Sequence, residues 1–200
     1  INDPRFAPAG VLAPKSKADL AFTMHILSWL AVNGTAAIVE FPGVLYRSGA
    51  EQKIRKYLID NNYVDAVIQL PPDLFFGTGI ATCIVVLKKS KTENKTLFID
   101  ASAQFVRGGN KNTLTEVNQK KILDSFTNRD DLAHFARLVD NSELAANDYN
   151  LSVTSYVQAE DTRVAVDIKV LNAEIEGIVT RQSKLRVAID AIVTDLESRN

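Results

Sequence analysis

The chain has few of the residues that hold disulfides and metals. Its single cysteine, Cys83, has no partner for an internal disulfide, which fits a reducing compartment, and its apolar neighbours predict a buried thiol. Neither histidine, His25 or His134, has a second ligand nearby in the sequence, so we expect structural roles for both. No apolar run approaches the ~20 residues of a membrane span, and no signal peptide is recognisable. We therefore expect a cytoplasmic protein that binds neither a metal nor a membrane.

The 200 residues also lack an excess of positive charge. The formal net charge is -1, whereas a protein that binds nucleic acid unaided carries a basic surplus. A nucleic-acid role would need local basic patches or a partner. The sequence begins with INDPRF, without an initiator methionine, which suggests a piece of a longer protein.

What the sequence does have is a pair of short apolar runs in the stretch VDAVIQLPPDLFFGTGIATCIVVLKK, residues 64–89. Residues 64–70 and 83–87 are rich in β-branched side chains and predict two buried strands. Pro71 and Pro72 end the first strand, because proline lacks the N–H that a sheet needs. The segment between the runs is therefore a loop at a strand end.

Two phenylalanines stand in this loop. Phe75 and Phe76 precede Gly77-Thr78-Gly79, where the glycines permit a tight turn. An aromatic side chain here either fills the local core or offers a stacking surface to a flat ligand, and its burial energy alone favours the core. At least one of the two rings cannot be fully buried at such a position.

Before this stretch, the pattern predicts a helix, a strand and a second helix. The first helix has a possible cap at Ser16 or Asp19 and ends at Asn33-Gly34. Its apolar residues at helical spacing are Phe22, Ile26, Trp29 and Leu30. Residues 35–41 predict a buried strand, and residues 50–61 a helix. The solvent-facing side of this helix carries Glu51, Lys53, Arg55 and Lys56.

Shorter elements follow the central stretch. Residues 97–102 predict a strand, and residues 116–126 a helix capped by Thr115. Between them, residues 105–113 form either a mobile surface loop or a phosphate-contacting loop, since a lone Gly-Gly pair is a weak signal. We also expect a short strand over residues 134–138. A turn over residues 147–150 separates the globular part from the tail.

This order of elements predicts an α/β layer structure. In open α/β sheets, ligands bind outside the carboxyl ends of the strands. That rule selects two loops, 42–49 and 71–82, for a functional site. We expect three regions: the end of a sheet domain over residues 1–100, an α+β extension over 101–158, and a helical tail over 159–200.

The tail carries a heptad pattern, which predicts one helix of roughly 45–50 Å over residues 167–198. The seam comprises Val164, Ile168, Leu171, Ile175, Ile178, Gln182, Leu185, Ile189, Ile192 and Leu196. The polar member, Gln182, fits a role in fixing register and partner number, and Gly177 predicts a kink or a close helix crossing. Such a helix exceeds what a compact domain of this size covers. We expect part of the seam to face another chain, with an internal hairpin folded onto the body as the alternative.

Several motifs together resemble one family. They are KADLAFTMHIL (17–27), FPGVLYRSGAEQKIRKYLI (41–59), LPPDLFFGTGIATCIVVLKK (70–89), LFIDAS (97–102), NRDDL (128–132) and NDYNLSVTSYV (147–157). From Pro4 to the tail, this set resembles the modification subunits of type I restriction-modification systems, which are adenine-N6 DNA methyltransferases. The resemblance implies the C-terminal part of a doubly wound, Rossmann-like sheet followed by a long helical tail. It further implies DNA as substrate, S-adenosylmethionine as methyl donor of the full-length enzyme, and a specificity subunit and a restriction subunit as partners.

Two motifs of that family are missing. The sequence has neither the glycine-rich loop that binds the methyl donor nor the Asn-Pro-Pro-Phe type motif that holds the amine of the target adenine. Leu70-Pro71-Pro72-Asp73 does not replace the second motif, because a leucine side chain has no carbonyl to accept a hydrogen bond. We expect both motifs upstream of Ile1. This chain then holds no catalytic residue and is inactive alone.

The resemblance also assigns site residues. It places Phe76, or else Phe75, where the family stacks an aromatic ring on a flipped-out adenine, and such stacking supplies roughly 1 to 3 kcal/mol. The implied active-site border comprises Asp19, Phe22, Pro42, Gly43, Arg47, Gly77 and Thr78. Candidate contacts to DNA phosphates are Arg47, Lys53, Arg55, Lys56 and Lys111. The implied docking segment for the specificity subunit comprises Leu171, Ile175, Ile178, Gln182, Leu185, Ile189 and Ile192.

A function of another class competes with this one. The chain can instead be a non-catalytic interaction module that docks the specificity subunit. In either case we expect strand 35–41 to lack a neighbour and to present a hydrophobic edge. Self-association of the chain would cover that edge.

Overall fold

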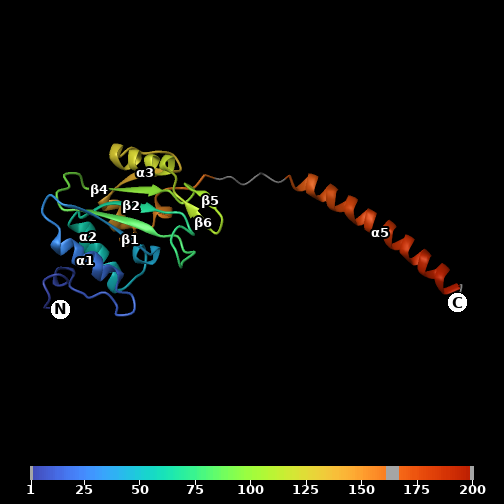
Figure 1. Ribbon diagram of the computed structural model, residues 1–200, viewed down its shortest axis with the longest axis horizontal. Coiled ribbons are helices and arrows are strands. Elements are labelled where there is room, and N and C mark those ends of the chain that lie inside the picture. The colour runs from blue at the N-terminus through green and yellow to red at the C-terminus, as the bar shows by residue number, and fades with distance from the viewer. Residues whose placement is uncertain (1, 161–166, 199–200) are drawn as a thin grey trace. The chain divides into compact units, whose positions relative to one another are not determined.

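The structure is a computed structural model that describes residues 2–160 and 167–198 (Figure 1). The chain divides into two compact units, Ile1–Glu160 and Asp161–Asn200, and each is described by itself. The first unit is a layered α/β body, and the second contains one long helix.

A mixed five-stranded sheet forms the centre of the body. In spatial order its strands are β1 (Thr35–Glu40), β3 (Cys83–Lys88), β2 (Val64–Gln69), β4 (Lys95–Asp100) and β7 (Ala136–Asp140). β2 and β4 run parallel, and the other neighbouring strands run antiparallel. The predicted α/β class is confirmed. The sheet also continues past residue 100, because β7 pairs with β4.

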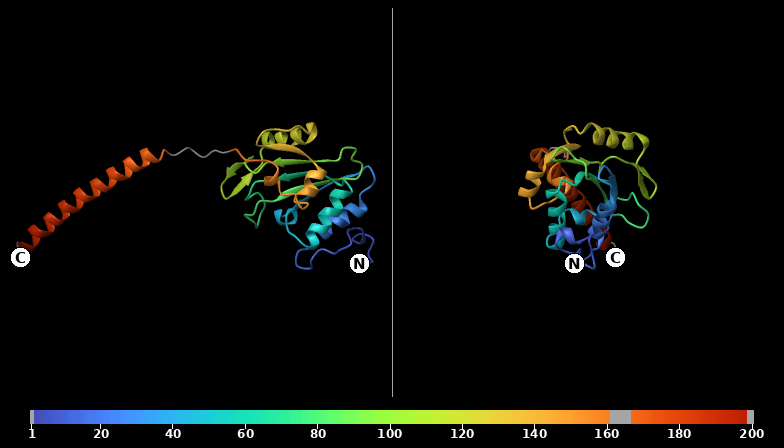
Figure 2. Two further views of the ribbon diagram at one scale, coloured as in Figure 1. Left: turned by 180° about the vertical axis from the view of Figure 1, so that it is seen from behind. Right: turned by 90° about the vertical axis from the view of Figure 1, so that its left-hand side faces the viewer.

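Helices cover both faces of this sheet. α1 (Asp19–Trp29) and α2 (Ala50–Asp60) lie on one face, and α3 (Glu116–Asn128) lies on the other, as Figures 1 and 2 show. The remaining short helices of the body are η1 (Ala7–Ala9), η2 (Pro42–Leu45), α4 (Asn141–Ala146) and η3 (Val153–Ser155). The body is therefore a three-layer arrangement.

The central strands β2 and β3 are buried, as their apolar sequences predicted. Residues 64–68 of β2 are all buried, and side chains alternate between the two faces. Val67 and Val85 belong to the cluster beneath α1 and α2, whereas Ile68 and Val86 belong to the cluster beneath α3. The two hydrophobic cores of the body therefore meet across these strands.

β1 is not buried as its apolar sequence predicted, but the expectation that strand 35–41 presents a hydrophobic edge is confirmed. It is the last strand of the sheet, and Val39 and the adjoining Phe41 are 51% and 44% exposed. Within the described residues, β3 is the one strand that pairs with β1. The backbone groups on the outer edge of β1 therefore make no hydrogen bonds to another described strand. β1 is an edge strand with an exposed apolar surface.

α1 was placed correctly, but its predicted apolar face was wrong. Phe22 and Trp29 are 64% and 79% exposed. The residues that face the core are Leu20, Thr23, Met24 and Leu27. The predicted cap was also wrong: the cap position is Ala18, which has no capping side chain, and the helix ends with Leu30 at the C-cap rather than at residue 33.

α2 shows a second difference. Lys53 and Lys56 lie on its solvent side, as predicted, but Glu51 and Arg55 are each 2% exposed. Arg47 Nη1 donates to Glu51 Oε1 at 3.0 Å, which pairs the buried carboxylate. The assignment of Glu51 and Arg55 to the wet side of the helix was therefore wrong.

Residues 105–113 are neither of the loops considered from the sequence. They form a hairpin of β5 (Val106–Gly108) and β6 (Lys111–Thr113), which pair antiparallel. α3 follows with Thr115 as its cap, as predicted, and Thr115 Oγ1 accepts a hydrogen bond from the Asn118 N–H at 3.3 Å. The strand predicted at residues 134–138 begins two residues later, and His134 lies in a left-handed turn with φ 59°.

The turn at residues 147–150 is present, with left-handed backbone at Asp148 and Tyr149. It does not separate the body from the tail, however. Residues 151–157 return to the core, where Leu151, Val153 and Val157 are at most 3% exposed. The Tyr156 ring packs on Phe98 of β4 with 4.4 Å between ring centroids.

The second unit contains α5 (Ile168–Ser198), a single helix of 31 residues, close to the predicted range. No residue of α5 is buried, and the helix runs through Gly177 without a break. An internal hairpin within residues 168–198 is therefore excluded, while Val164 lies outside the described residues. No described helix, α5 included, combines the length and the apolar character that a membrane span requires.

Candidate functional site

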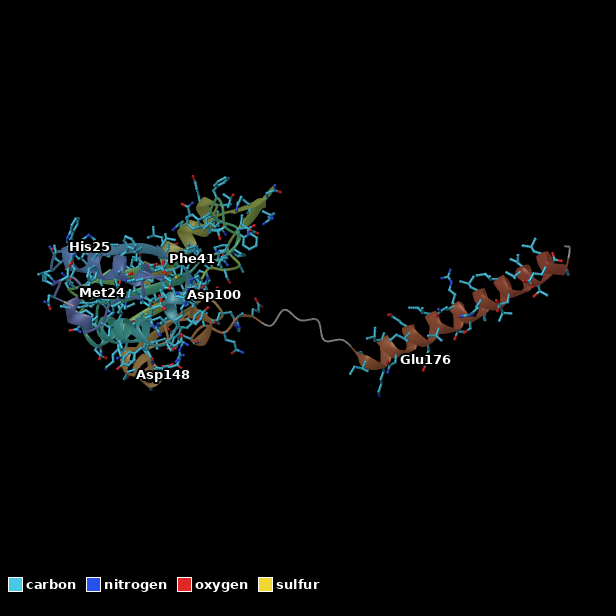
Figure 3. The ribbon with its side chains drawn as sticks, turned by 90° about the horizontal axis from the view of Figure 1, so that it is seen from below. Met24, His25, Phe41, Asp100, Asp148 and Glu176 are labelled. Carbon is cyan, nitrogen blue, oxygen red and sulfur yellow. The ribbon has the colours of Figure 1, made fainter. Side chains whose placement is uncertain are left out.

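The carboxyl ends of β1, β2 and β4 lie at the same end of the sheet. Glu40 of β1 and Gln69 of β2 both pair with Cys83, the first residue of β3, and Gln69 also pairs with Asp100 of β4. Figure 3 shows Phe41 and Asp100 toward this end of the strands. The loops that follow the three strands therefore meet there, as the rule for α/β sheets predicts.

A hollow of about 340 Å³ opens beside the end of β1. Three phenylalanines from different elements line it: Phe22 of α1, Phe41 after β1, and Phe75 of the β2–β3 loop. The other lining residues are Asp19, Ile38, Val39, Glu40, Thr78 and Thr82. The site is an aromatic hollow with several oxygen-bearing side chains.

Four residues predicted for the site from the sequence meet in this aromatic hollow. They are Asp19, Phe22, Phe75 and Thr78. Pro42, Gly43 and Arg47 do not line it, although Phe41 immediately before them does. Arg47 instead lines a separate cavity with Tyr46 and Ser48, and its guanidinium packs against Gly43.

Phe75 and Phe76 are placed differently. Phe75 lines the aromatic hollow and is 40% exposed, whereas Phe76 is 100% exposed and does not line it. The prediction that at least one ring escapes burial is confirmed. Gly77, with φ 81°, provides the left-handed backbone of the turn that follows them.

Glu40 is the functional-site candidate that sequence reasoning missed. Its carboxylate is buried, and its Oε1 accepts a hydrogen bond from Thr23 Oγ1 at 2.8 Å. Burial raises the pKa of Glu40, the hydrogen bond from Thr23 opposes the rise, and the charge of Asp19 adds to it. A protonatable carboxyl therefore lies in the wall of the aromatic hollow.

Two neighbours of Glu40 at the start of β3 are also buried. Burial raises the pKa of the Cys83 thiol to about 12, so Cys83 is an inert core residue, as predicted. Thr82 Oγ1 is buried and has no hydrogen-bond partner among the described residues. Phe41 and Thr82 both escaped sequence reasoning, because neither type of residue signals a site by itself.

The five basic residues proposed as phosphate contacts differ in what their charged groups bind, and Arg47 is paired with Glu51. Arg55 is excluded, because its buried guanidinium donates to the carbonyl oxygens of Tyr149 and Val44 at 2.8 and 2.9 Å. Lys111 and Lys56 have internal partners as well: Lys111 Nζ donates to the Phe75 carbonyl oxygen at 2.8 Å, and Lys56 Nζ to Tyr149 Oη at 2.8 Å. Lys53 is exposed, and its ammonium makes no hydrogen bond or ion pair to the part of the chain that the structure describes.

The two glycines of the β1–α2 connection do not form a cradle for a nucleotide-like methyl donor. In the β1–α2 connection, the space over Gly43 is filled by the guanidinium of Arg47, and Gly49 is an isolated glycine at the cap of α2. The described part of the chain likewise contains no cluster of three or more histidine, cysteine or acidic side chains arranged for a metal. His25 packs on Trp29, with 4.5 Å between ring centroids, and the His134 ring hydrogen-bonds the Gln158 carbonyl oxygen.

The open α/β sheet and the hollow at its strand ends define the class of protein, an α/β domain with a ligand site at the carboxyl ends of its strands. The family model described as N-6 DNA Methylase matches residues 1–165. The chain belongs to the N-6 DNA methylase family.

Within this family, the chain is similar to methylase subunits of type I restriction enzymes. It is 50% identical over 198 residues to the type I restriction enzyme MpnII methylase subunit of Mycoplasma pneumoniae. The aligned region covers 98% of this chain and 36% of that protein. The chain is 32% identical over 194 residues to the MjaVII methylase subunit of Methanocaldococcus jannaschii, covering 94% and 33%. The chain thus spans about a third of the length of these relatives. The resemblance to type I modification subunits is confirmed.

Solved structures agree with this assignment. The crystal structure of the type I restriction-modification system methyltransferase subunit from Streptococcus thermophilus matches with a TM-score of 0.77 and 46% identity, covering 78% of this chain and 34% of that chain. The EcoKI M protein matches with a TM-score of 0.61 at 17% identity, over 84% and 42% of the two chains, which shows a shared fold.

Proposed function

We propose that this chain forms the stacking wall of the target-base site in an adenine-N6 DNA methylase that takes its methyl group from S-adenosylmethionine. The observation that carries the proposal is the aromatic hollow, where Phe22, Phe41 and Phe75 converge at the carboxyl end of β1. A base swung out of a duplex loses its stacking neighbours and needs new contacts to its faces. Phenyl rings around a cavity of about 340 Å³ offer such contacts to a flat heteroaromatic ring.

The β2–β3 loop presents two rings for this role. The resemblance to the family favours Phe76, which is fully exposed and free to stack on a ligand. The cavity favours Phe75, which already lies in the aromatic hollow. Asp19 and Thr78 add oxygen atoms that can hydrogen-bond the polar edge of a base.

The chemistry itself lies outside this chain. The guanidinium of Arg47 fills the space over Gly43, and the sequence contains no Asn-Pro-Pro-Phe type motif for the adenine amine. The chain alone is then inactive, and within the complete cytoplasmic enzyme it shapes the base site. Among the basic candidates, Lys53 has the freest ammonium for a DNA phosphate.

α5 supports a docking role beside the stacking role. Its heptad seam is exposed along the whole helix: Leu171, Ile175, Ile178, Leu185, Ile189 and Ile192 are between 44% and 67% exposed. A helix with such a seam is stabilised by packing on other helices. The specificity subunit is the proposed partner, with Gln182 setting the register, and the restriction subunit joins the complete complex. This docking would accompany the stacking role, so the chain need not be a purely non-catalytic module.

The test uses the full-length subunit assembled with its specificity subunit. Phe75→Ala, Phe76→Ala and the double variant are compared for methyl transfer to the DNA site. Loss of stacking worth about 1–3 kcal/mol predicts a rate reduced roughly 5- to 150-fold in at least one single variant. Trp29→Ala is the control, because this exposed aromatic lies at the far end of α1, before the start of β1. Undiminished methylation by the double variant would show that the loop does not stack on the base.

A further inference from the structure

The β5–β6 hairpin packs against the loop that carries Phe75 and Phe76. Figure 1 shows the arrows of β2 and β4 pointing toward this hairpin. Three of its residues, Arg107, Lys111 and Asn112, make hydrogen bonds to residues 72–78. The hairpin is therefore a support for the loop.

Asn112 is the buried centre of this support, at 5% exposed. Its side-chain amide donates to the Pro72 carbonyl oxygen at 2.8 Å, and its backbone N–H donates to the Asp73 carbonyl oxygen at 3.0 Å. Its Oδ1 accepts from Arg107 Nη1 at 3.2 Å. Asn112 of β6 thus connects the start of the loop, at Pro72 and Asp73, to Arg107 of β5.

Arg107 continues the same network on the solvent side. Its Nη1 also donates to Asp73 Oδ2 at 3.0 Å. Asp73 has φ 53°, a left-handed conformation that turns the chain and that few residues besides glycine, asparagine and aspartate adopt readily. The contacts from Arg107 and Asn112 therefore hold the loop where its backbone turns.

Lys111 holds the far side of the loop. Its ammonium donates to the carbonyl oxygens of Phe75 and Thr78 at 2.8 and 3.2 Å. These two carbonyls bracket Phe76 and Gly77, so one cation closes the turn on which both rings stand. Charge-assisted hydrogen bonds are among the stronger ones, and two from one group restrict the turn further.

The loop has little else to hold it in place. Leu74 packs at the edge of the core, but Phe75, Phe76, Gly77 and Ile80 are all exposed, so burial contributes little at the tip of the loop. Leu70 N–H closes the base of the loop by donating to the Thr82 carbonyl oxygen at 2.8 Å, but nearer the tip the bond from Asp73 N–H to the Gly79 carbonyl oxygen is long, at 3.4 Å. Loops with few buried contacts open at low free energy unless other groups fix them.

We propose that Lys111 and Asn112 are positioning residues that hold the Phe75–Phe76 turn in the conformation that receives the target base. This proposal rests on the proposed function of the loop and adds a role for the hairpin. Lys111 then acts through the turn rather than through a DNA phosphate. An ordered turn avoids the entropy of ordering it when the base arrives.

The first experiment measures the turn itself, in the 200-residue chain and without any activity assay. Hydrogen exchange is followed at the amides of Asp73 and Ile80, which donate to the Gly79 carbonyl oxygen and to Thr78 Oγ1, in Lys111→Met, Lys111→Arg and Asn112→Ala. We expect exchange about 10-fold faster in Lys111→Met and Asn112→Ala, a smaller change in Lys111→Arg, and unchanged protection in β2 and β3. Lys120→Met is the matched control, since that exposed lysine pairs with Asp124 on α3. Equal exchange in all the chains would overturn the proposal.

The second experiment uses the full-length subunit with its specificity subunit and DNA carrying 2-aminopurine at the target position. Lys111→Met should lower both the fluorescence of the extruded base and the methylation rate, with recovery in Lys111→Arg. If the Phe75/Phe76 double variant slows methylation while Lys111→Met and Asn112→Ala do not, the positioning role is wrong and the stacking role stands. If the double variant also has no effect, the proposed function fails, and hydrogen exchange alone then decides whether the hairpin holds the turn.

Discussion

Arg55 and Tyr149 join two segments that are 94 residues apart: the Nε of Arg55 donates to the Tyr149 carbonyl oxygen at 2.8 Å. The same guanidinium donates from Nη1 to the Val44 carbonyl oxygen at 2.9 Å. Burial lowers the pKa of Arg55 to about 10, with the charge of Glu51 acting in the opposite direction. Arg55 therefore holds η2, α2 and the turn at residues 147–150 together.

Replacing Arg55 by methionine should strongly destabilise the body. The substitution leaves the carbonyl oxygens of Val44 and Tyr149 without these donors, and each loss costs about 1–3 kcal/mol, so we expect a total of about 2–6 kcal/mol. Urea denaturation of the chain measures the effect. Lys53→Met, on the exposed side of the same helix, should change the free energy of unfolding by less than about 0.5 kcal/mol. Equal stability of the two variants would mean that Arg55 has no structural role.

Glu40 should make stability depend on pH. Because the folded state raises the pKa of Glu40 above the ordinary value of 4.5, the native protein binds this proton more tightly than the unfolded chain. Stability from this group is therefore present at low pH and is lost as pH rises past 4.5. Glu40→Gln keeps an oxygen for Thr23 and cannot ionise. We expect it to match the parent below pH 4.5 and to be more stable near neutral pH, by about 1.4 kcal/mol for each unit of raised pKa. If the difference in free energy of unfolding between Glu40→Gln and the parent were the same at all pH values, the result would argue against a buried ionising carboxyl.

Lys91 should have the opposite dependence. Burial lowers its pKa from 10.5 to about 8, so the native protein binds this proton less tightly, and stability from this group rises between pH 8 and 10.5. Lys91→Met removes the partly buried charge, and the Val64 carbonyl oxygen keeps its hydrogen bond from Thr96 Oγ1 at 3.1 Å. The gain in stability of the methionine variant over the parent should be largest below pH 8 and shrink toward pH 10.5. A gain that stays constant across this range would contradict the assignment.

The outer edge of β1 should drive self-association of the chain. Exposed apolar edge strands pair with other edges, and an inward or edge lysine blocks such pairing. We expect sedimentation to show dimers or larger species whose share falls in Val39→Lys. Val117→Lys, at a 78% exposed position on α3, should leave the association unchanged. A parent chain that sediments as a monomer at all concentrations would refute this expectation.

The seam of α5 should be needed for binding to the specificity subunit. Leu185→Asp places a charge in the seam, whereas Val187→Asp places the same charge two positions away, on another side of the helix. We expect the first variant of the full-length subunit to lose copurification with the specificity subunit and the second to keep it. Both residues are exposed, at 57% and 69%, so neither change should unfold the protein. Equal binding by the two variants would place the interface elsewhere.

Local signals in the sequence were sufficient for most elements of the fold. β2 and β3 are short apolar runs bounded by prolines and lysines, and α3 begins at the capping residue Thr115. Arg55 could not be predicted in the same way, because periodicity assigns a charged side chain to solvent. Its carbonyl partner at residue 149 is a long-range contact that only the folded chain provides.

The site was predictable to a similar extent. The rule about strand ends selected loops 42–49 and 71–82, and only the second contributes residues to the aromatic hollow, where Phe75 and Thr78 meet Asp19 and Phe22. Glu40 was missed because a single glutamate at the end of a strand gives no sequence signal. The support of the β2–β3 loop by Lys111 was missed because a Gly-Gly pair between polar residues predicts a loop as readily as a docked hairpin.

The return of residues 151–157 to the core sets an order for folding. Leu151 N–H bonds the Leu45 carbonyl oxygen at 2.8 Å, and Tyr156 packs on Phe98, so the last residues of the body complete a core begun by the first. Contacts between such distant parts of a chain form late, because a long loop must close first. During synthesis, the apolar face of α1, α2 and the sheet therefore stays exposed to solvent until residues 151–157 have left the ribosome and can cover it. α5 is translated after these residues.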